Sequence, residues 1–166
     1  SHAKAVSQTA GARLGAIADV DEAKRTSVVS QFEGVEGVAD YHDVLARPDV
    51  EAVVIALPHW LHAQAAVDAA NAGKHILIEK PLANSVAECD AILEAVHRNK
   101  VNLMVGHTQH VSPVGMAVKQ ALLDGRIGQL IMGIDQWNKP YNPQSRPAWM
   151  MDRARGGGMQ LMDGVH

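Results

Sequence analysis

Several features are scarce in this sequence, and each scarcity excludes a class of protein. Its single cysteine, Cys89, allows no internal disulfide, which fits a reducing cytoplasm. The 15 lysines and arginines nearly balance the 18 aspartates and glutamates, and there is no basic run of the kind that follows a nucleic-acid backbone. The longest apolar stretches, such as residues 50–58, are far shorter than the roughly 20 residues that span a bilayer. We therefore expect a globular cytoplasmic protein with no nucleic-acid partner and no membrane span.

Two kinds of segment alternate along the chain instead. Short runs rich in β-branched residues are followed by longer, alanine-rich amphipathic runs, which is the pattern of a parallel sheet covered by helices. The predicted fold class is therefore α/β. Strands are predicted over residues 12–19, 35–39, 50–57, 74–79 and 101–106, with an extended segment over 127–137. Helices are predicted over residues 21–31, 41–47, 62–71, 85–99 and 113–123.

Local signals mark where several of these helices begin or end. The helix over 41–47 should end before Pro48, because the residue before a proline is biased away from helical geometry. Gly73 is a good C-terminal stop for the alanine-rich helix before it. Ser85 and Glu88, three residues apart, have the sequence pattern of a capping box.

One segment carries a specific signature. Residues 56–82, ALPHWLHAQAAVDAANAGKHILIEKPL, join a strand end, a Pro-containing turn, a His, an Ala-rich helix, Gly-Lys-His, a second strand and Glu-Lys-Pro. This order resembles the signature of the nicotinamide-dependent oxidoreductases of the glucose-fructose oxidoreductase, inositol dehydrogenase and MocA family. ADVD at residues 18–21 is similar to the end of that family's second Rossmann strand, and GGGMQLMDGVH at residues 156–166 to the glycine-rich run before its catalytic His. The resemblance covers essentially the whole chain.

The resemblance implies a doubly wound parallel sheet of the Rossmann type over residues 1–124, followed at 125–166 by the start of an α+β substrate domain. It also implies a fragment. Residues 2–5 would lie in the first helix, so the first strand and its G-x-G-x-x-G loop would precede Ser1, and most of the substrate domain would follow His166. In a Rossmann sheet of order 3-2-1-4-5-6 the first strand lies between the second and the fourth, so two strands would lose a partner edge. Because unpaired buried backbone groups are costly, we expect these residues alone to form no stable cofactor site.

Residues at strand ends are the candidates for cofactor binding. Asp19 closes the first predicted strand, where a carboxylate accepts hydrogen bonds from a ribose 2′-hydroxyl and repels a 2′-phosphate, which favours NAD over NADP. The alternative role for Asp19 is that of an N-cap. By resemblance, Leu57, Pro58 and His62 belong to the turn that passes beneath the cofactor, and His59 also lies near the cofactor. For His59 and His62, the alternative is a packing role without contact to the cofactor.

Glu79 and Lys80 end a predicted strand, and strand alternation sends their side chains to opposite faces. Ligands bind outside the carboxyl ends of the strands in open α/β sheets. By resemblance, Lys80 is catalytic and points toward both the substrate and the nicotinamide, while Glu79 helps to order the ribose side. Elsewhere a lysine at a strand end is usually only solvated.

The resemblance assigns proton exchange with the substrate hydroxyl to His166, a residue type whose ordinary pKa near neutrality suits acid–base work. Many members of the family carry an Asp four residues before this His, whereas this chain has Met162 there and an acid at Asp163. Dihydrodiol dehydrogenase-like members have an Asn immediately before Gly-Val-His, which Asp163 could replace. Asp163 is therefore a second candidate catalytic residue, and the class of substrate stays open.

The remaining polar and sulfur-containing residues give weaker signals. His107 and His110 have His-x-x-His spacing, but no Cys or acidic cluster accompanies them, so no metal site is predicted. By resemblance, Gln109 and His110 line the substrate pocket. For Trp149 and the methionines at 150–162, core or interface packing is favoured over a metal or cofactor site.

Taken with the motifs, the resemblance implies an NAD(P)-dependent dehydrogenase that moves a hydride between the cofactor, NAD more than NADP, and a CH–OH group of a small molecule. Sugars, cyclitols, polyols and dihydrodiols are the candidate substrates, and the parent enzyme would be a homo-oligomer. Two other hypotheses stay open: a relative that senses cofactor without catalysis, and a fragment with no function by itself. The altered Asp position favours the first of these, and the intact Glu79-Lys80-Pro81 opposes it.

Overall fold

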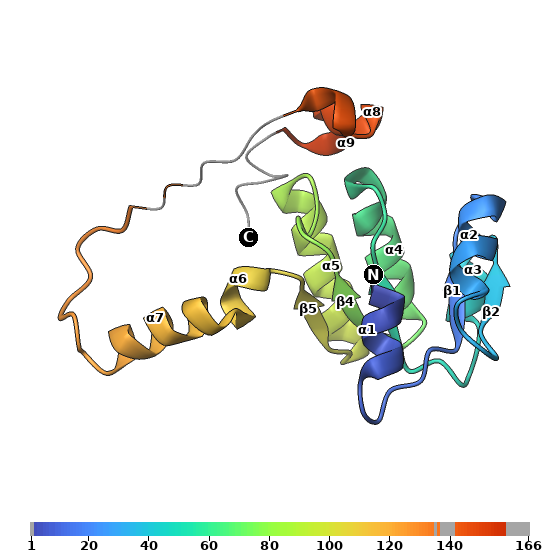
Figure 1. Cartoon of the computed structure of the whole chain (residues 1–166), viewed down its shortest axis with the longest axis horizontal. Coiled ribbons are helices and arrows are strands. Elements are labelled where there is room, and N and C mark those ends of the chain that lie inside the picture. The colour runs from blue at the N-terminus through green and yellow to red at the C-terminus, as the bar shows by residue number, and fades with distance from the viewer. Residues whose placement is uncertain (1, 135, 137–141, 159–166) are drawn as a thin grey trace.

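The computed structural model of this chain describes residues 2–134, 136 and 142–158 (Figure 1). Its strands are all parallel and form two sheets. In the first sheet β1 (Ala16–Ala18) pairs with β2 (Glu36–Val38), and in the second the order is β3 (Ala52–Ile55), β4 (His75–Ile78), β5 (Leu103–Val105). The predicted parallel α/β class is therefore confirmed.

Helices follow the strands in sequence, as the alternation predicts. The longer ones are α1 (His2–Gln8), α2 (Glu22–Val29), α3 (Tyr41–Leu45), α4 (His62–Asn71), α5 (Val86–Asn99) and α7 (Pro113–Leu123). The shorter ones are η1 (His59–Leu61), α6 (Thr108–Val111), η2 (Pro143–Ser145), α8 (Ala148–Met151) and α9 (Arg153–Gly156). The predicted bounds of α4 and α7 are confirmed, whereas the strands are shorter than predicted. Over 127–134 no strand forms, so the expected extended segment joins neither sheet within the described residues.

The core lies between the three-stranded sheet and the two long helices α4 and α5, which run side by side in Figure 1. Ile78 of β4 and Ile92 of α5 are fully buried. Facing them, α4 presents alanines with almost no exposed surface, Ala66, Ala69 and Ala70. Their small side chains let α5 approach α4 closely. The capping box predicted for α5 is confirmed, since the Ser85 and Glu88 side chains each accept from the other's backbone N–H.

A second set of contacts joins the two sheets along their amino-terminal side. Lys74 is buried, and its Nζ donates to the carbonyl oxygens of Arg47 (2.7 Å) and Val50 (2.9 Å). Arg47 also binds Asp49 and Glu36, and these guanidinium contacts hold the pKa of Asp49 well below its usual range. Because these ion pairs are largely exposed, they contribute little stability, and the buried lysine is the more important tie.

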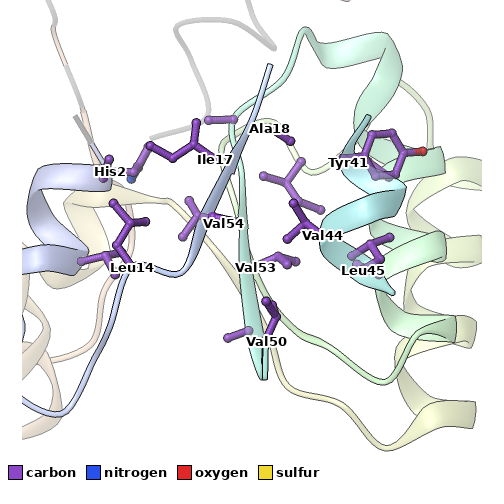
Figure 2. Close-up of a pocket in the computed structure, with 18 of the residues that line it drawn as sticks. His2, Leu14, Ile17, Ala18, Tyr41, Val44, Leu45, Val50, Val53 and Val54 are labelled. Carbon is purple, nitrogen blue, oxygen red and sulfur yellow. The ribbon is translucent and has the colours of Figure 1, made fainter. Parts of the chain in front are cut away.

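The two sheets are separated by a cavity of about 290 Å³ between β1 and β3. Figure 2 shows apolar side chains from both strands facing it, Ile17 from β1 and Val53 and Val54 from β3. Residues of α1 line one side, and residues of α3 and α4 line the other. Val54 lies mid-strand and is nevertheless 37% exposed. The space corresponds to the position between second and fourth strands that the Rossmann order gives to a first strand.

After β5 the chain extends beyond the two sheets and the helices that cover them. In Figure 1, α6 and α7 extend away from the sheets, whereas α8 and α9 return above the ends of α4 and α5. Four apolar side chains of α7 are more than half exposed, Val114, Met116, Val118 and Leu123. Within the part of the chain that the structure describes, no helix has the length and apolar character needed to cross a membrane.

Candidate functional site

A second cavity, of about 410 Å³, lies at the carboxyl ends of β3 and β4. The register pairs Ile55 with Ile78, so the segments that follow the two strands emerge side by side. The cavity is lined by Ala56, Leu57, Pro58, His59, Glu79, Lys80, Arg146, Trp149 and Met150. Five residues predicted from the sequence are thus brought together on one cavity, at the sheet edge where open α/β proteins bind ligands.

The carboxylate of Glu79 is fixed by contacts on two sides. Its Oε1 lies 2.8 Å from Nε2 of His2 in α1, and its Oε2 accepts from the backbone N–H of Lys80 at 3.2 Å. Gly106, after β5, lies beside this carboxylate, and a Cβ added there would make ordinary van der Waals contacts, 3.5 Å from Oε2 and 3.4 Å from the carbonyl oxygen of Ile78. Glu79 therefore links the end of β4 to α1.

His59 forms part of the wall and is held neutral. It is 8% exposed, its Nδ1 lies 3.2 Å from the carbonyl oxygen of Gly156, and Trp149 meets its ring edge-on at 4.8 Å. Burial lowers the pKa of His59; the Gly156 contact opposes this, and the charges of His62 and Lys80 add to the lowering. With Nδ1–H donating to Gly156, Nε2 is the acceptor of the ring.

The lowered pKa of His59 predicts a pH dependence of stability. Below the ordinary value of 6.5 the unfolded chain binds more protons than the folded chain, so the stabilisation is complete above that pH and is lost as the pH falls through the lowered pKa. We expect the Tm to fall between pH 7.5 and 5.5, and to fall less in His59→Gln. Calorimetric melts at both pH values measure this difference.

His42→Gln is the control for that experiment. Asp40 raises the pKa of His42, so any contribution from this exposed residue has the opposite sign and is lost as the pH rises. Equal slopes of Tm against pH in His59→Gln and the parent chain would contradict the prediction.

His62 lies deeper than the sequence suggested. It is fully buried, and its Nε2 and Nδ1 lie 2.8 Å from the carbonyl oxygens of Leu57 and Pro81 respectively. Both polar atoms of the ring are therefore used inside the protein. His62 does not line the 410 Å³ cavity, and its predicted role beside the cofactor stays a prediction.

Asp19 follows β1 at the carboxyl edge of the smaller sheet. Its Oδ1 accepts from the backbone N–H of Asp21 at 2.9 Å, and Asp21 is itself the N-cap of α2. The alternative reading of Asp19 as that N-cap is therefore wrong, because Asp21 accepts from the Lys24 N–H that a cap must satisfy. Arg25 donates to the carbonyl oxygen of Asp19 at 2.6 Å, which places a guanidinium beside the same strand end.

The other predicted site residues are not part of the 410 Å³ cavity as described. Gln109 and His110 lie on α6, are exposed, and do not line it. The rings of His107 and His110 are 5.5 Å apart, and in the described ranges no three His, Cys, Asp or Glu side chains gather as metal ligands would. Asp163 and His166 lie outside the described residues, so their catalytic roles stay predictions.

Arg146 is the lining residue that sequence reasoning missed. It is partly buried, and it reaches the cavity from a Gly- and Pro-rich segment without periodicity. Trp149 and Met150 come from the same segment, and Trp149 packs edge-on against both His59 and Trp60, as the packing interpretation predicts. Only the tertiary fold places this segment, which lies about 70 residues from Lys80, at the cavity.

Comparisons with known proteins agree with this geometry. The family described as an oxidoreductase family with an NAD-binding Rossmann fold matches residues 1–107. The chain is also 40% identical over 131 residues to an inositol 2-dehydrogenase of Rhizobium meliloti, a match that covers 79% of this chain and 39% of that protein. The chain belongs to this oxidoreductase family. The predicted Rossmann-type fold is thereby confirmed.

Two solved structures show how far the likeness to this oxidoreductase family extends. A levoglucosan dehydrogenase in complex with NADH and levoglucosan matches with a TM-score of 0.74 and 29% identity, covering 87% of this chain and 40% of that one. An NAD-binding protein from Listeria innocua matches with a TM-score of 0.80 and 26% identity, covering 99% of this chain and 48% of that one. The chain spans about two fifths of the length of the curated relatives it matches.

Proposed function

We propose that this chain is the nicotinamide-binding part of a dehydrogenase that transfers a hydride between NAD and a CH–OH group of a sugar, cyclitol, polyol or dihydrodiol. The observation that carries the proposal is the 410 Å³ cavity, which gathers Lys80, Glu79 and the Leu57–His59 turn at one sheet edge. Its volume falls within the range of small-molecule sites. The relatives named above, an inositol and a levoglucosan dehydrogenase, support this substrate class.

In this proposal Lys80 is the central catalytic residue. Its ammonium donates a hydrogen bond to the substrate oxygen and stabilises the negative charge that grows there as the C–H bond breaks. NAD supplies the hydride acceptor. The hydroxyl proton passes to His166, with Asp163 as the alternative base, and Gln109 and His110 contact the substrate. These last four roles rest on the family resemblance.

The residues at the cofactor side fit a dinucleotide. Asp19 presents a carboxylate at the end of β1, with one oxygen bound to a backbone N–H and oriented by it. A carboxylate so placed accepts from the ribose hydroxyls of NAD and repels the 2′-phosphate of NADP. On the nicotinamide side, the neutral His59 offers an acceptor nitrogen, and Leu57 and Pro58 supply an apolar floor.

In the whole parent enzyme, Asp19→Asn should weaken NAD binding about tenfold or more and reduce the preference for NAD over NADP. The amide removes charge-assisted acceptance, worth roughly 1.5–3 kcal/mol, and the guanidinium of Arg25 remains beside the vacated charge. Affinities for both cofactors by calorimetry measure the change. Asp43→Asn, an exposed carboxylate on α3, is the matched control. A preference that stays unaltered in Asp19→Asn would remove Asp19 from the cofactor site.

The overall function is tested in the whole parent enzyme, by NADH formation from NAD with myo-inositol, levoglucosan and a cis-dihydrodiol, because the 166 residues alone are expected to form no stable cofactor site. Formation of NADH with any of these supports the dehydrogenase. NAD binding with no turnover on any of the three favours the cofactor-sensing relative instead. The absence of a cooperative thermal melt in the 166-residue chain favours the fragment without function.

We further infer a cytoplasmic setting and a homo-oligomeric parent enzyme. The single Cys89, whose thiol pKa is raised by burial, needs no oxidising compartment. The exposed apolar side chains of α7 support the inference that another surface covers this helix. That surface would belong either to the substrate domain proposed for residues 125–166 or to another subunit.

A further inference from the structure

His62 lies where two loops of the 410 Å³ cavity meet. It is the first residue of α4 and has no exposed surface. Its Nε2 is 2.8 Å from the carbonyl oxygen of Leu57, in the turn after β3, and its Nδ1 is 2.8 Å from the carbonyl oxygen of Pro81, directly after Lys80. One side chain therefore joins the turn after β3 to the loop after β4.

The chemistry of these two contacts is unusual for a histidine. A carbonyl oxygen can only accept, and a neutral imidazole carries a single N–H, so one tautomer can satisfy only one of the two carbonyls. The other carbonyl would then face the lone pair of a bare nitrogen at 2.8 Å. An imidazolium instead carries a hydrogen on both nitrogens and makes two charge-assisted bonds at the distances observed.

The two adjacent histidine rings differ in the hydrogen-bond partners that they face. The His59 ring lies 5.7 Å from the His62 ring, at an interplanar angle of 61°. Burial lowers the pKa of His59, the charges of His62 and Lys80 lower it further, and its one N–H is used on Gly156. His59 therefore needs one hydrogen, whereas His62 faces two acceptors. A buried cation is tolerated only when it is hydrogen-bonded, and here the two carbonyl oxygens provide the bonds.

We propose that His62 donates a hydrogen bond from each ring nitrogen and so acts as a positioning residue, which fixes the loop that carries Lys80 relative to the Leu57–His59 turn. Without this link, the two strand ends would keep the bond from the Glu79 N–H to the Ile55 carbonyl oxygen (2.9 Å) but would lose the connection between Leu57 and Pro81 beyond it. The proposal rests on the proposed function only for the catalytic role of Lys80. The double donation stands on the geometry of His62 alone.

The protonation of His62 can be read directly by NMR. In the full chain with ¹⁵N-labelled histidine, under conditions where the His59 ring shows one protonated nitrogen, a two-bond ¹H–¹⁵N correlation should show two protonated ring nitrogens for His62. The signals are assigned by their disappearance in His62→Gln. One protonated and one bare nitrogen in this ring would overturn the proposal.

The positioning role is tested by amide hydrogen exchange. His62→Leu should speed exchange at least tenfold in residues 57–61 and 79–84, while the β1–β2 sheet keeps its parent rate. His62→Gln, whose amide nitrogen carries two hydrogens, should restore part of the protection, and His97→Leu, an exposed position on α5, should change nothing. If His62→Leu does not fold, His62→Gln carries the test, with intermediate protection in both loops as the expected result.

Parent rates in both loops of the substituted chains would overturn the positioning role. An absence of NADH formation, with His62 doubly protonated and both loops protected, would count against the proposed function and leave this inference standing.

Discussion

Adding an apolar parallel strand and a glycine-rich loop ahead of His2 should raise the Tm of the chain by about 10 °C or more and create an NAD site. The added strand would pair with the free edges of β1 and β3 and fill the 290 Å³ cavity between them. Each new backbone hydrogen bond contributes about 1 kcal/mol net, and each kcal/mol corresponds to roughly 2–4 °C at this chain length. Thermal melts and NAD calorimetry of the two chains measure both effects.

A Gly/Ser extension of the same length is the control, since it adds residues without apolar side chains or strand propensity. We expect it to leave the Tm unchanged and to create no NAD site. Tight NAD binding by the 166 residues without any extension would show that the central strand is dispensable, and the argument from the two open strand edges would then be wrong.

In the whole parent enzyme, Lys80→Met should lower kcat for NADH formation by about 10²–10⁴-fold while the affinity for NAD changes only a few-fold. Methionine keeps the length and apolar stem of lysine but removes the charge that, in the proposed function, faces the substrate oxygen and acts mainly on the transition state. Because Arg146 lines the same cavity, some electrostatic stabilisation should survive in the variant. Steady-state rates with the best substrate, together with NAD calorimetry, separate the two effects.

Lys119→Met, on the exposed surface of α7, is the matched control and should leave both quantities unchanged. A Lys80→Met enzyme that keeps the parent kcat would assign the catalysis to another group. Loss of NAD affinity with kcat preserved would make Lys80 a cofactor ligand only.

The parts of the fold that the sequence predicted best are those governed by local chemistry. The bounds of α4 follow from an alanine-rich run that ends before Gly73, and the start of α5 follows from the Ser85–Glu88 capping box. Strand ends were predicted less well, because a strand extends only as far as its partner allows. The run over 12–19 forms strand only at Ala16–Ala18, where three residues of β2 lie opposite.

The residues of the candidate site also divide into those that could be predicted from the sequence and those that could not. The family resemblance implied Lys80, Glu79 and the Leu57–His59 turn as site residues, and they meet at one cavity because parallel strands bring their carboxyl ends together. Arg146 could not be predicted, since its position depends on how an irregular segment returns over the sheet. The complete burial of His62 could not be predicted either, because the sequence does not show which way the ring of a histidine at a helix start points.

The cavity between β1 and β3 divides the ligand-binding surface as well as the sheet. Asp19 belongs to the β1–β2 unit and Lys80 to the β3–β4–β5 unit. A dinucleotide that contacts both is in effect a bivalent ligand, and its avidity depends on how firmly one unit presents its half-site to the other. Rigid filling of the gap would raise the effective concentration of the second half-site. Affinity for the whole cofactor is then set as much by the middle of the sheet as by the residues that contact the ligand.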